Sequence, residues 1–174
     1  MKQPIRRLAL SMLTTLFFFG AGAHAAPATP ATATYSDAAA LKGVTQGKGI
    51  FMISLDHPQK MALYLKVIGG THDNFMSQGV TPDLKVVFIG ASVPHLTQSL
   101  QAQGDAASRE TYVELARQVE QLKAKGVRLE VCAIATGLFG INNADLLKPL
   151  DVVNDGFIST IGYQTQGYQL VPIY

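Results

Sequence analysis

Short apolar runs alternate with helical patterns along most of the chain, and three of these runs predict buried strands. Each run is nearly unbroken, as expected when both faces of a strand are covered. They are GIFMISL at residues 49–55, LKVVFIG at residues 84–90 and VRLEVCAIA at residues 127–135. Two shorter apolar segments, at residues 152–153 and 168–174, predict a fourth and a fifth strand.

The segments between these runs have the period of amphipathic helices. Residues 109–125 carry the clearest apolar stripe, with Ser108 placed to cap the helix and Gly126 to end it. Asp56-His57-Pro58 opens an earlier helix, because a capping residue followed by proline suits a first turn. Shorter helices are expected after Pro94-His95 and over residues 142–147 and 157–166.

Strands that alternate with helices predict a parallel sheet, because parallel neighbours need crossover connections. We expect the α/β class: a single doubly wound, mostly parallel five-stranded sheet with helices on both faces and a flavodoxin-like strand order. Ligands of such sheets bind beyond the carboxyl ends of the strands. The residues that directly follow each strand are therefore the first candidates for a functional site.

The first 25 residues have the pattern of a secretory signal peptide. A basic start with Lys2, Arg6 and Arg7 precedes an apolar run, and Ala23-His24-Ala25 matches a cleavage site. The apolar run, residues 8–19, is shorter than the roughly 20 residues of a membrane-spanning helix. We therefore expect cleavage, a periplasmic location and no stable membrane insertion afterwards. An uncleaved signal anchor is the alternative.

Removal of the signal peptide, residues 1–25, leaves 149 residues, the size of one ordinary domain. Residues 26–46 are rich in Ala, Thr and Pro and predict a flexible lead-in to a single domain at residues 47–174. All three charges of the signal are basic, so the rest of the chain carries 11 Lys and Arg against 12 Asp and Glu. A net charge of −1 argues against nucleic acid as a partner.

The cysteine and histidine content limits the chemistry further. A single cysteine rules out an intrachain disulfide and a Cys-rich zinc or iron–sulfur site. His57, His72 and His95 lie in three separate segments without the spacing of metal ligands. We expect neither a metal nor another cofactor.

Cys132 lies late in the third predicted strand, a few residues before the rim of the sheet. Two interpretations remain open for it. As a small apolar residue it would pack in the core, which is common for free cysteine. In an oxidising compartment, however, an idle thiol is a liability, and N–H groups and histidines at the rim would favour a nucleophilic thiolate.

Polar and small residues follow the other predicted strands at the same rim. His57 and His95 would stabilise a thiolate or orient a ligand, unless they only cap a helix or lie exposed. Asn154 and Gly156 precede a predicted helix whose N–H groups would bind an anion, although turn chemistry explains them equally well. The candidate binding residues are His57, Ser92, His95, Thr136, Asn154, Gly156 and Ser159.

Several segments, taken in order, resemble the DsrE/DsrF-like sulfur-relay family, specifically its exported members. In the C-terminal half these are the cysteine of the third strand, Asp145-Leu146-Leu147, VVNDGFIS at residues 152–159 and YQTQGYQLVPIY at residues 163–174. The N-terminal half adds GIFMISL, THDNFMSQG at residues 71–79 and PDLKVVFIGASV at residues 82–93. The resemblance covers most of the predicted domain.

The resemblance implies a homotrimer or homohexamer that carries sulfur as a cysteine persulfide between partner proteins. Only Cys132 matches the family's cysteine, and the sequence names neither the sulfur donor nor the acceptor protein. A persulfide carrier needs one thiolate, not two. The expected function is a periplasmic carrier of sulfane sulfur or a sulfurtransferase. The alternative is a non-catalytic oligomeric ligand-binding or assembly module with a buried structural cysteine.

Overall fold

The computed structural model describes residues 35–174, and the predicted signal peptide lies outside this range. One compact unit spans Ser36–Tyr174. Its strands are β1 (Gln46–Ile53), β2 (Thr81–Phe88), β3 (Arg128–Cys132), β4 (Asp151–Val153) and β5 (Gln169–Ile173). Its helices are α1 (Pro58–Ser77), α2 (Ala106–Ala124), α3 (Ala133–Leu138) and α4 (Gly156–Thr165), with 3₁₀ turns η1 (Gly90–Leu96), η2 (Gln98–Ala102) and η3 (Asn143–Asp145).

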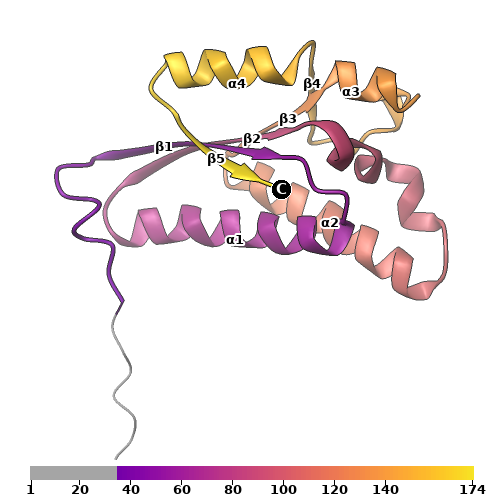
Figure 1. The fold of residues 1–174 in the computed structure, drawn as a ribbon. Coiled ribbons are helices and arrows are strands. Elements are labelled where there is room, and N and C mark those ends of the chain that lie inside the picture. The colour runs from indigo at the N-terminus through magenta and orange to yellow at the C-terminus, as the bar shows by residue number, and fades with distance from the viewer. Residues whose placement is uncertain (1–34) are drawn as a thin grey trace, which may run out of the picture. The chain divides into compact units, whose positions relative to one another are not determined.

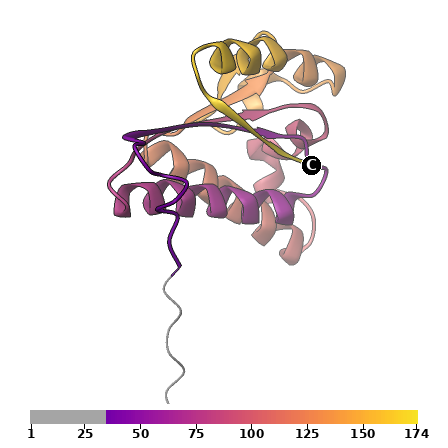
Figure 2. The same cartoon turned by 60° about the vertical axis from the view of Figure 1, so that its left-hand side comes forward.

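The five strands form one parallel sheet with helices on both faces, which confirms the predicted fold class. The strand order is β4-β3-β2-β1-β5, whereas flavodoxin itself has the order 2-1-3-4-5. Figures 1 and 2 show α1 and α2 on one face, and α3 and α4 on the other. The chain therefore winds outward from β1 to β4, and α4 carries it back across the opposite face to β5.

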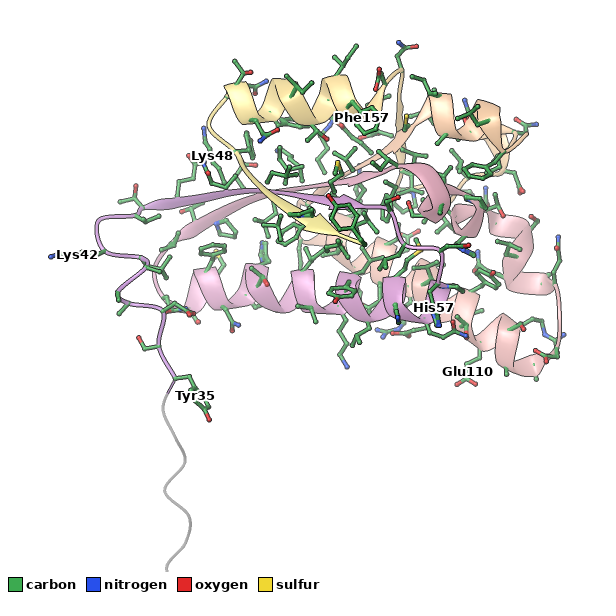
Figure 3. The ribbon with its side chains drawn as sticks, viewed as in Figure 1. Tyr35, Lys42, Lys48, His57, Glu110 and Phe157 are labelled. Atoms are coloured by element: carbon green, nitrogen blue, oxygen red, sulfur yellow. The ribbon has the colours of Figure 1, made fainter. Side chains whose placement is uncertain are left out.

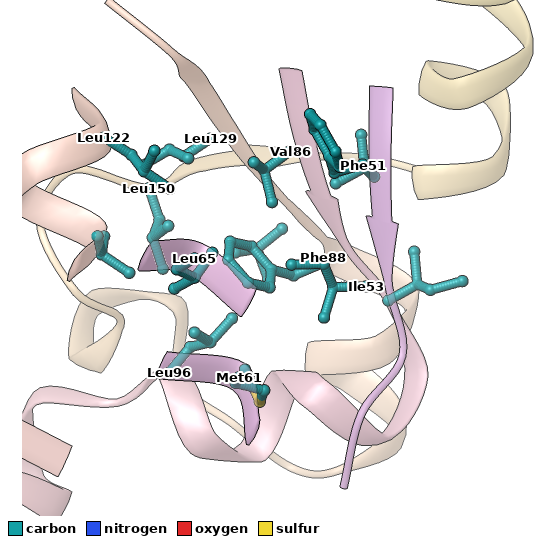
Figure 4. Close-up of a cluster of buried hydrophobic side chains, with 14 of the residues drawn as sticks. Phe51, Ile53, Met61, Leu65, Val86, Phe88, Leu96, Leu122, Leu129 and Leu150 are labelled. Atoms are coloured by element: carbon teal, nitrogen blue, oxygen red, sulfur yellow. The ribbon is translucent and has the colours of Figure 1, made fainter. Parts of the chain in front are cut away.

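The main core lies between the sheet and the pair α1 and α2. Apolar side chains from β1, β2 and β3 pack there against the inward stripes of both helices (Figure 4). The fully buried side chains of this core include Ile53, Met61, Leu65, Val86, Phe88, Leu96, Leu122 and Leu129. The apolar stripe predicted for residues 109–125 therefore indicates the buried face of α2, which includes Leu115, Val119 and Leu122. No helix among residues 35–174 is long and apolar enough to cross a membrane.

The start of α2 differs in detail from the expectation, whereas the start of α1 agrees with it. The helix α2 begins at Ala106 and is capped by Asp105, whose carboxylate accepts the N–H of Ser108 over 2.8 Å. Ser108 therefore lies inside the first turn and is not the cap, because aspartate three residues earlier already satisfies its N–H group. The helix α1 is capped by His57, followed by Pro58 in the first turn.

The third strand is shorter than its apolar run indicates. The strand β3 ends at Cys132, and the next residue, Ala133, begins the short helix α3. An apolar run of this length is compatible with a strand or a helix, so the sequence pattern alone does not locate the change. The correction places Cys132 at the carboxyl end of β3 itself.

Candidate functional site

Cys132 is the last residue of β3 and lies directly beneath the start of α4. Its backbone pairs with Val153 of β4, and only 6% of its surface is exposed. A side chain at Gly156, the first residue of α4, would place its Cβ 3.1 Å from the Cβ of Cys132 and 2.6 Å from Cγ2 of Ile89. Glycine at position 156 therefore lets the helix start come into contact with the cysteine.

The helix α4 turns polar side chains toward the sheet. Ser159 and Tyr163, one helical turn apart, both donate hydrogen bonds from their hydroxyl groups to the carboxylate of Glu130. The Tyr163 bond measures 2.7 Å, and Arg128 donates to the same carboxylate over 2.5 Å. Because side chains alternate along a strand, Glu130 and Cys132 point to the same face of the sheet, the face that α4 covers.

Glu130 is a buried charged group, with 2% of its surface exposed. Burial opposes its ionisation, but hydrogen bonds from Arg128, Ser159 and Tyr163 outweigh burial and lower the pKa of this carboxyl below its usual value. Burial and the adjacent carboxylate raise the pKa of Tyr163 to about 12, so its hydroxyl remains a donor. The site beneath α4 therefore contains a fully paired carboxylate.

A second polar cluster joins the ends of β1 and β2 to α2. Nε2 of His95 lies 2.9 Å from Oδ1 of Asp56, and Nδ1 lies 3.2 Å from the hydroxyl oxygen of Tyr112. A neutral imidazole satisfies both contacts if it donates to Asp56 and accepts from Tyr112. These partners place His95 on the α2 side of the sheet, whereas Cys132 faces α4.

The other predicted binding residues have local structural partners. His57 accepts the N–H of Lys60 as the cap of α1, and Figure 3 shows it across the sheet from Phe157 of α4. The hydroxyl of Ser92, which is fully buried, donates to the carbonyl oxygens of Ile53 and Ile89. The side chain at position 92 therefore links the ends of β1 and β2.

The remaining candidates lie near Cys132. Thr136 is buried in α3, and its hydroxyl donates to the carbonyl of Ala133. Asn154 is exposed in the turn between β4 and α4, while Asp155 caps α4 by accepting the N–H of Phe157 over 2.8 Å. The structure thus brings together Cys132, Thr136, Gly156 and Ser159, whereas His57 and His95 lie on the opposite side of the sheet.

An exposed apolar surface covers α3, the outer side of α4 and β4; we call it the α3–α4 surface. Only Gly156 and Thr160 of α4 are buried, so this helix has its polar side inward and its apolar side outward. The surface consists of Ile134, Leu138, Phe139, Val152, Phe157, Ile158 and Ile161, each at least 41% exposed. Large exposed apolar side chains gathered on one face of a protein are typical of a binding interface.

The sequence pattern did not single out Glu130 or Tyr112 as parts of a site. A carboxylate in an otherwise apolar strand, on the same parity as Cys132, is a signal that a buried partner must exist. Ser159 and Tyr163, spaced four apart, supply that partner from a segment far along the chain. Among residues 35–174, no group of three or more His, Cys, Asp or Glu side chains has the arrangement of a metal site.

The fold and the site define a small three-layer α/β protein with one thiol at the carboxyl edge of a parallel sheet. The sequence profile of the DsrE/DsrF-like family matches residues 16–173. The chain belongs to this family, which is associated with sulfur relay. A search among curated proteins finds no match.

Solved structures of other proteins share this fold. A protein of unknown function from Methanobacterium thermoautotrophicum has a TM-score of 0.56 at 23% identity, with 72% of this chain and 98% of that chain covered. The ychN protein from E. coli has a TM-score of 0.54 at 14% identity, with 74% and 99% covered. At these identities the likeness shows the fold alone.

Proposed function

We propose that this protein accepts sulfane sulfur on Cys132 and passes it on as a persulfide. The observation that carries the proposal is the position of Cys132 at the carboxyl end of β3, where parallel sheets bind their ligands. Membership of a family associated with sulfur relay supports the same conclusion. No other cysteine is present in the chain to share the reaction.

The transfer is an exchange of sulfur between thiolates. The Cys132 thiolate attacks the outer sulfur of a donor persulfide, R–S–SH, so that a new S–S bond forms while the donor's S–S bond breaks. The donor leaves as the thiolate R–S⁻ with the bonding electron pair and takes up a proton from water. An acceptor thiolate then attacks the outer sulfur and releases Cys132 as a thiolate. No external oxidant or reductant is consumed.

Reaction at this thiol requires the chain above it to move, because Cys132 is 6% exposed. Gly156 covers it through the start of α4, which is a smaller obstacle than a core helix packed by large apolar side chains. Local opening of such an element costs less free energy than unfolding of the whole domain. A sulfur donor would reach Cys132 when this helix start is displaced.

The proposal is tested by intact-protein mass spectrometry. Incubation of the purified protein with a small sulfane donor should add mass in steps of one sulfur atom, and a thiol reductant should remove it. The variant Cys132→Ser should gain no mass, while keeping the far-UV spectrum of the wild type. Absence of any gain on the wild-type protein, after long incubation, would contradict the proposal.

The burial of Cys132 favours a second candidate function, a non-catalytic assembly or ligand-binding module. Cys132 belongs to the same buried cluster as Val87, Ile89 and Val131, so its side chain also fills space. Under this alternative, titration with a thiol reagent should show no reaction until the protein is denatured. Slow but complete reaction of the folded protein would instead favour the sulfur carrier.

We also propose that the protein is exported to the periplasm and assembles with copies of itself. The signal-peptide pattern of residues 1–25 supports export. The α3–α4 surface supports assembly, because a second copy would remove its apolar side chains from water. The resemblance to exported family members makes a trimer or a hexamer the expected assembly.

A further inference from the structure

We propose that Glu130 is a positioning residue, which holds α4 closed over Cys132 through its hydrogen bonds to Ser159 and Tyr163. The importance of this contact for sulfur transfer rests on the proposed function. Its role in holding α4 against β3 does not depend on that function. Glu130 and Cys132 lie two residues apart on one strand and on one face. Both are covered by the same helix, one under its first residue and the other under its middle.

Polar contacts contribute to the attachment of α4 to the sheet, together with the packing of the Tyr163 ring against the buried core. Its large apolar side chains, Phe157, Ile158 and Ile161, point away from the sheet and are exposed. Of its two buried residues, Gly156 has no side chain, and Thr160 donates its hydroxyl within the helix to the carbonyl of Gly156. The Ser159 and Tyr163 bonds to Glu130 are therefore the polar links between the helix and β3.

The two hydrogen bonds to Glu130 fix the position of the first two turns of α4, which include the residue that covers Cys132. Ser159 is one turn from Gly156, and Tyr163 is a further turn along, so the two bonds fix both the height and the rotation of α4. Arg128 holds the carboxylate in place from β3 itself. When the two hydroxyl groups release Glu130, the first turn of α4 can move away from β3 and expose Cys132. The sheet itself remains intact.

The rate at which iodoacetamide alkylates Cys132 in the folded protein tests this inference. Ser159→Ala and Tyr163→Phe each remove one hydroxyl and keep the helix sequence otherwise compatible with the fold. When opening is fast relative to alkylation, the rate follows the population of the open state. A hydrogen bond to a charged group stabilises the closed state enough for its loss to raise the rate about tenfold. The double variant should react about a hundredfold faster than the wild type.

Tyr168→Phe is the matched control, because it also removes a bond from a phenol to a carboxylate on the same face. Its hydroxyl donates to Asp83 over 2.6 Å, beyond the end of α4. This variant should alkylate at the wild-type rate. Urea unfolding of all variants gives the global stability, and amide hydrogen exchange should show faster exchange in α4 but not in α1. A loss of exchange protection that is confined to α4 would show that the hydroxyl groups position this helix and do not stabilise the whole domain.

The outcomes distinguish this inference from the proposed function. Faster alkylation without sulfur gain from a sulfane donor would support the role of Glu130 and contradict the sulfur carrier. Equal alkylation rates in the wild type and the double variant would overturn the inference, whatever the protein does with sulfur. An equal increase in Tyr168→Phe would overturn it as well. If the double variant fails to fold, the alkylation rate of Ser159→Ala alone tests the inference, since this variant removes only one small hydroxyl group.

Discussion

Replacement of Gly156 by alanine tests how closely α4 lies on β3. The added methyl group would be 2.6 Å from Cγ2 of Ile89, 3.1 Å from Cβ of Cys132 and 3.4 Å from Cγ1 of Val87. Unstrained carbon atoms pack at roughly 3.5–4.0 Å, so the helix start or its neighbours must move by about 1 Å. The backbone itself tolerates alanine, because Gly156 is not among the glycines with positive φ.

The expected cost follows from two opposing effects. Insertion of a methyl group into a packed site costs about 1–3 kcal/mol. The better helix propensity of alanine returns at most about 1 kcal/mol. We therefore expect Gly156→Ala to lower the free energy of unfolding by about 1–2 kcal/mol. The displaced helix start should also make the thiol of Cys132 react faster with alkylating reagents.

Gly162→Ala provides the control within the same helix. No heavy atom lies within 4 Å of a Cβ added at Gly162, so this variant keeps the propensity gain without the clash. It should raise the free energy of unfolding by up to about 1 kcal/mol and leave the alkylation rate unchanged. Urea unfolding followed by far-UV circular dichroism measures both variants, since the chain has no tryptophan for fluorescence. Equal protein concentrations are needed if the protein assembles.

The comparison of Gly156→Ala with Gly162→Ala, in free energy of unfolding and in alkylation rate, tests whether α4 packs closely on Cys132. Equal stability of the two alanine variants, together with equal thiol reactivity, would refute the close packing of α4 on Cys132. Destabilisation by Gly156→Ala without faster alkylation would show that the helix start absorbs the methyl group without uncovering the thiol. In that case the path of a sulfur donor to Cys132 would have to lie elsewhere.

Two further predictions concern charge and assembly. The pKa of Glu130 is lowered from 4.5, so its contribution to stability is present above about pH 4.5 and is lost as the pH falls through the folded-state value. Urea unfolding between pH 7 and pH 3 should therefore show a smaller acid loss for Glu130→Gln than for the wild type, and parallel curves would contradict the role of this carboxylate. Ile158→Lys places a charge at the exposed side of α4 and should convert an oligomer to smaller species in sedimentation equilibrium, with the outward-facing Leu63→Lys of α1 as control. An unchanged mass would exclude the α3–α4 surface as the interface.

Most elements of the fold could be predicted from the hydrophobic pattern. Unbroken runs or clear stripes indicate β1, β2 and α2, although each element begins three residues before its predicted range. Burial on two faces or on one face leaves this periodic trace. The end of β3 could not be predicted in the same way. Ala133 and Ile134 continue the apolar run of the strand, yet they form the first turn of α3. A local pattern does not distinguish these conformations, since a short apolar run is compatible with a strand or a helix.

The candidate site was predicted only in part. The position of Cys132 near the rim and the spacing of Ser159 and Tyr163 are visible in the sequence, but the partner of these hydroxyl groups is not. The predicted role of His95 beside the thiol also depended on the face of the sheet on which the segment after β2 would place this side chain. Its contacts with Asp56 and Tyr112 place it on the α2 side.

By itself the sequence determined the fold class and the inward stripes of the long helices, because both follow from the order and period of apolar residues. Only the tertiary structure decided that α4 carries its polar side inward, that Glu130 receives its hydroxyl groups, and that Gly156 covers Cys132. These contacts join residues from distant segments. Their geometry depends on strand order and on the packing of one helix, which no local period of the sequence records.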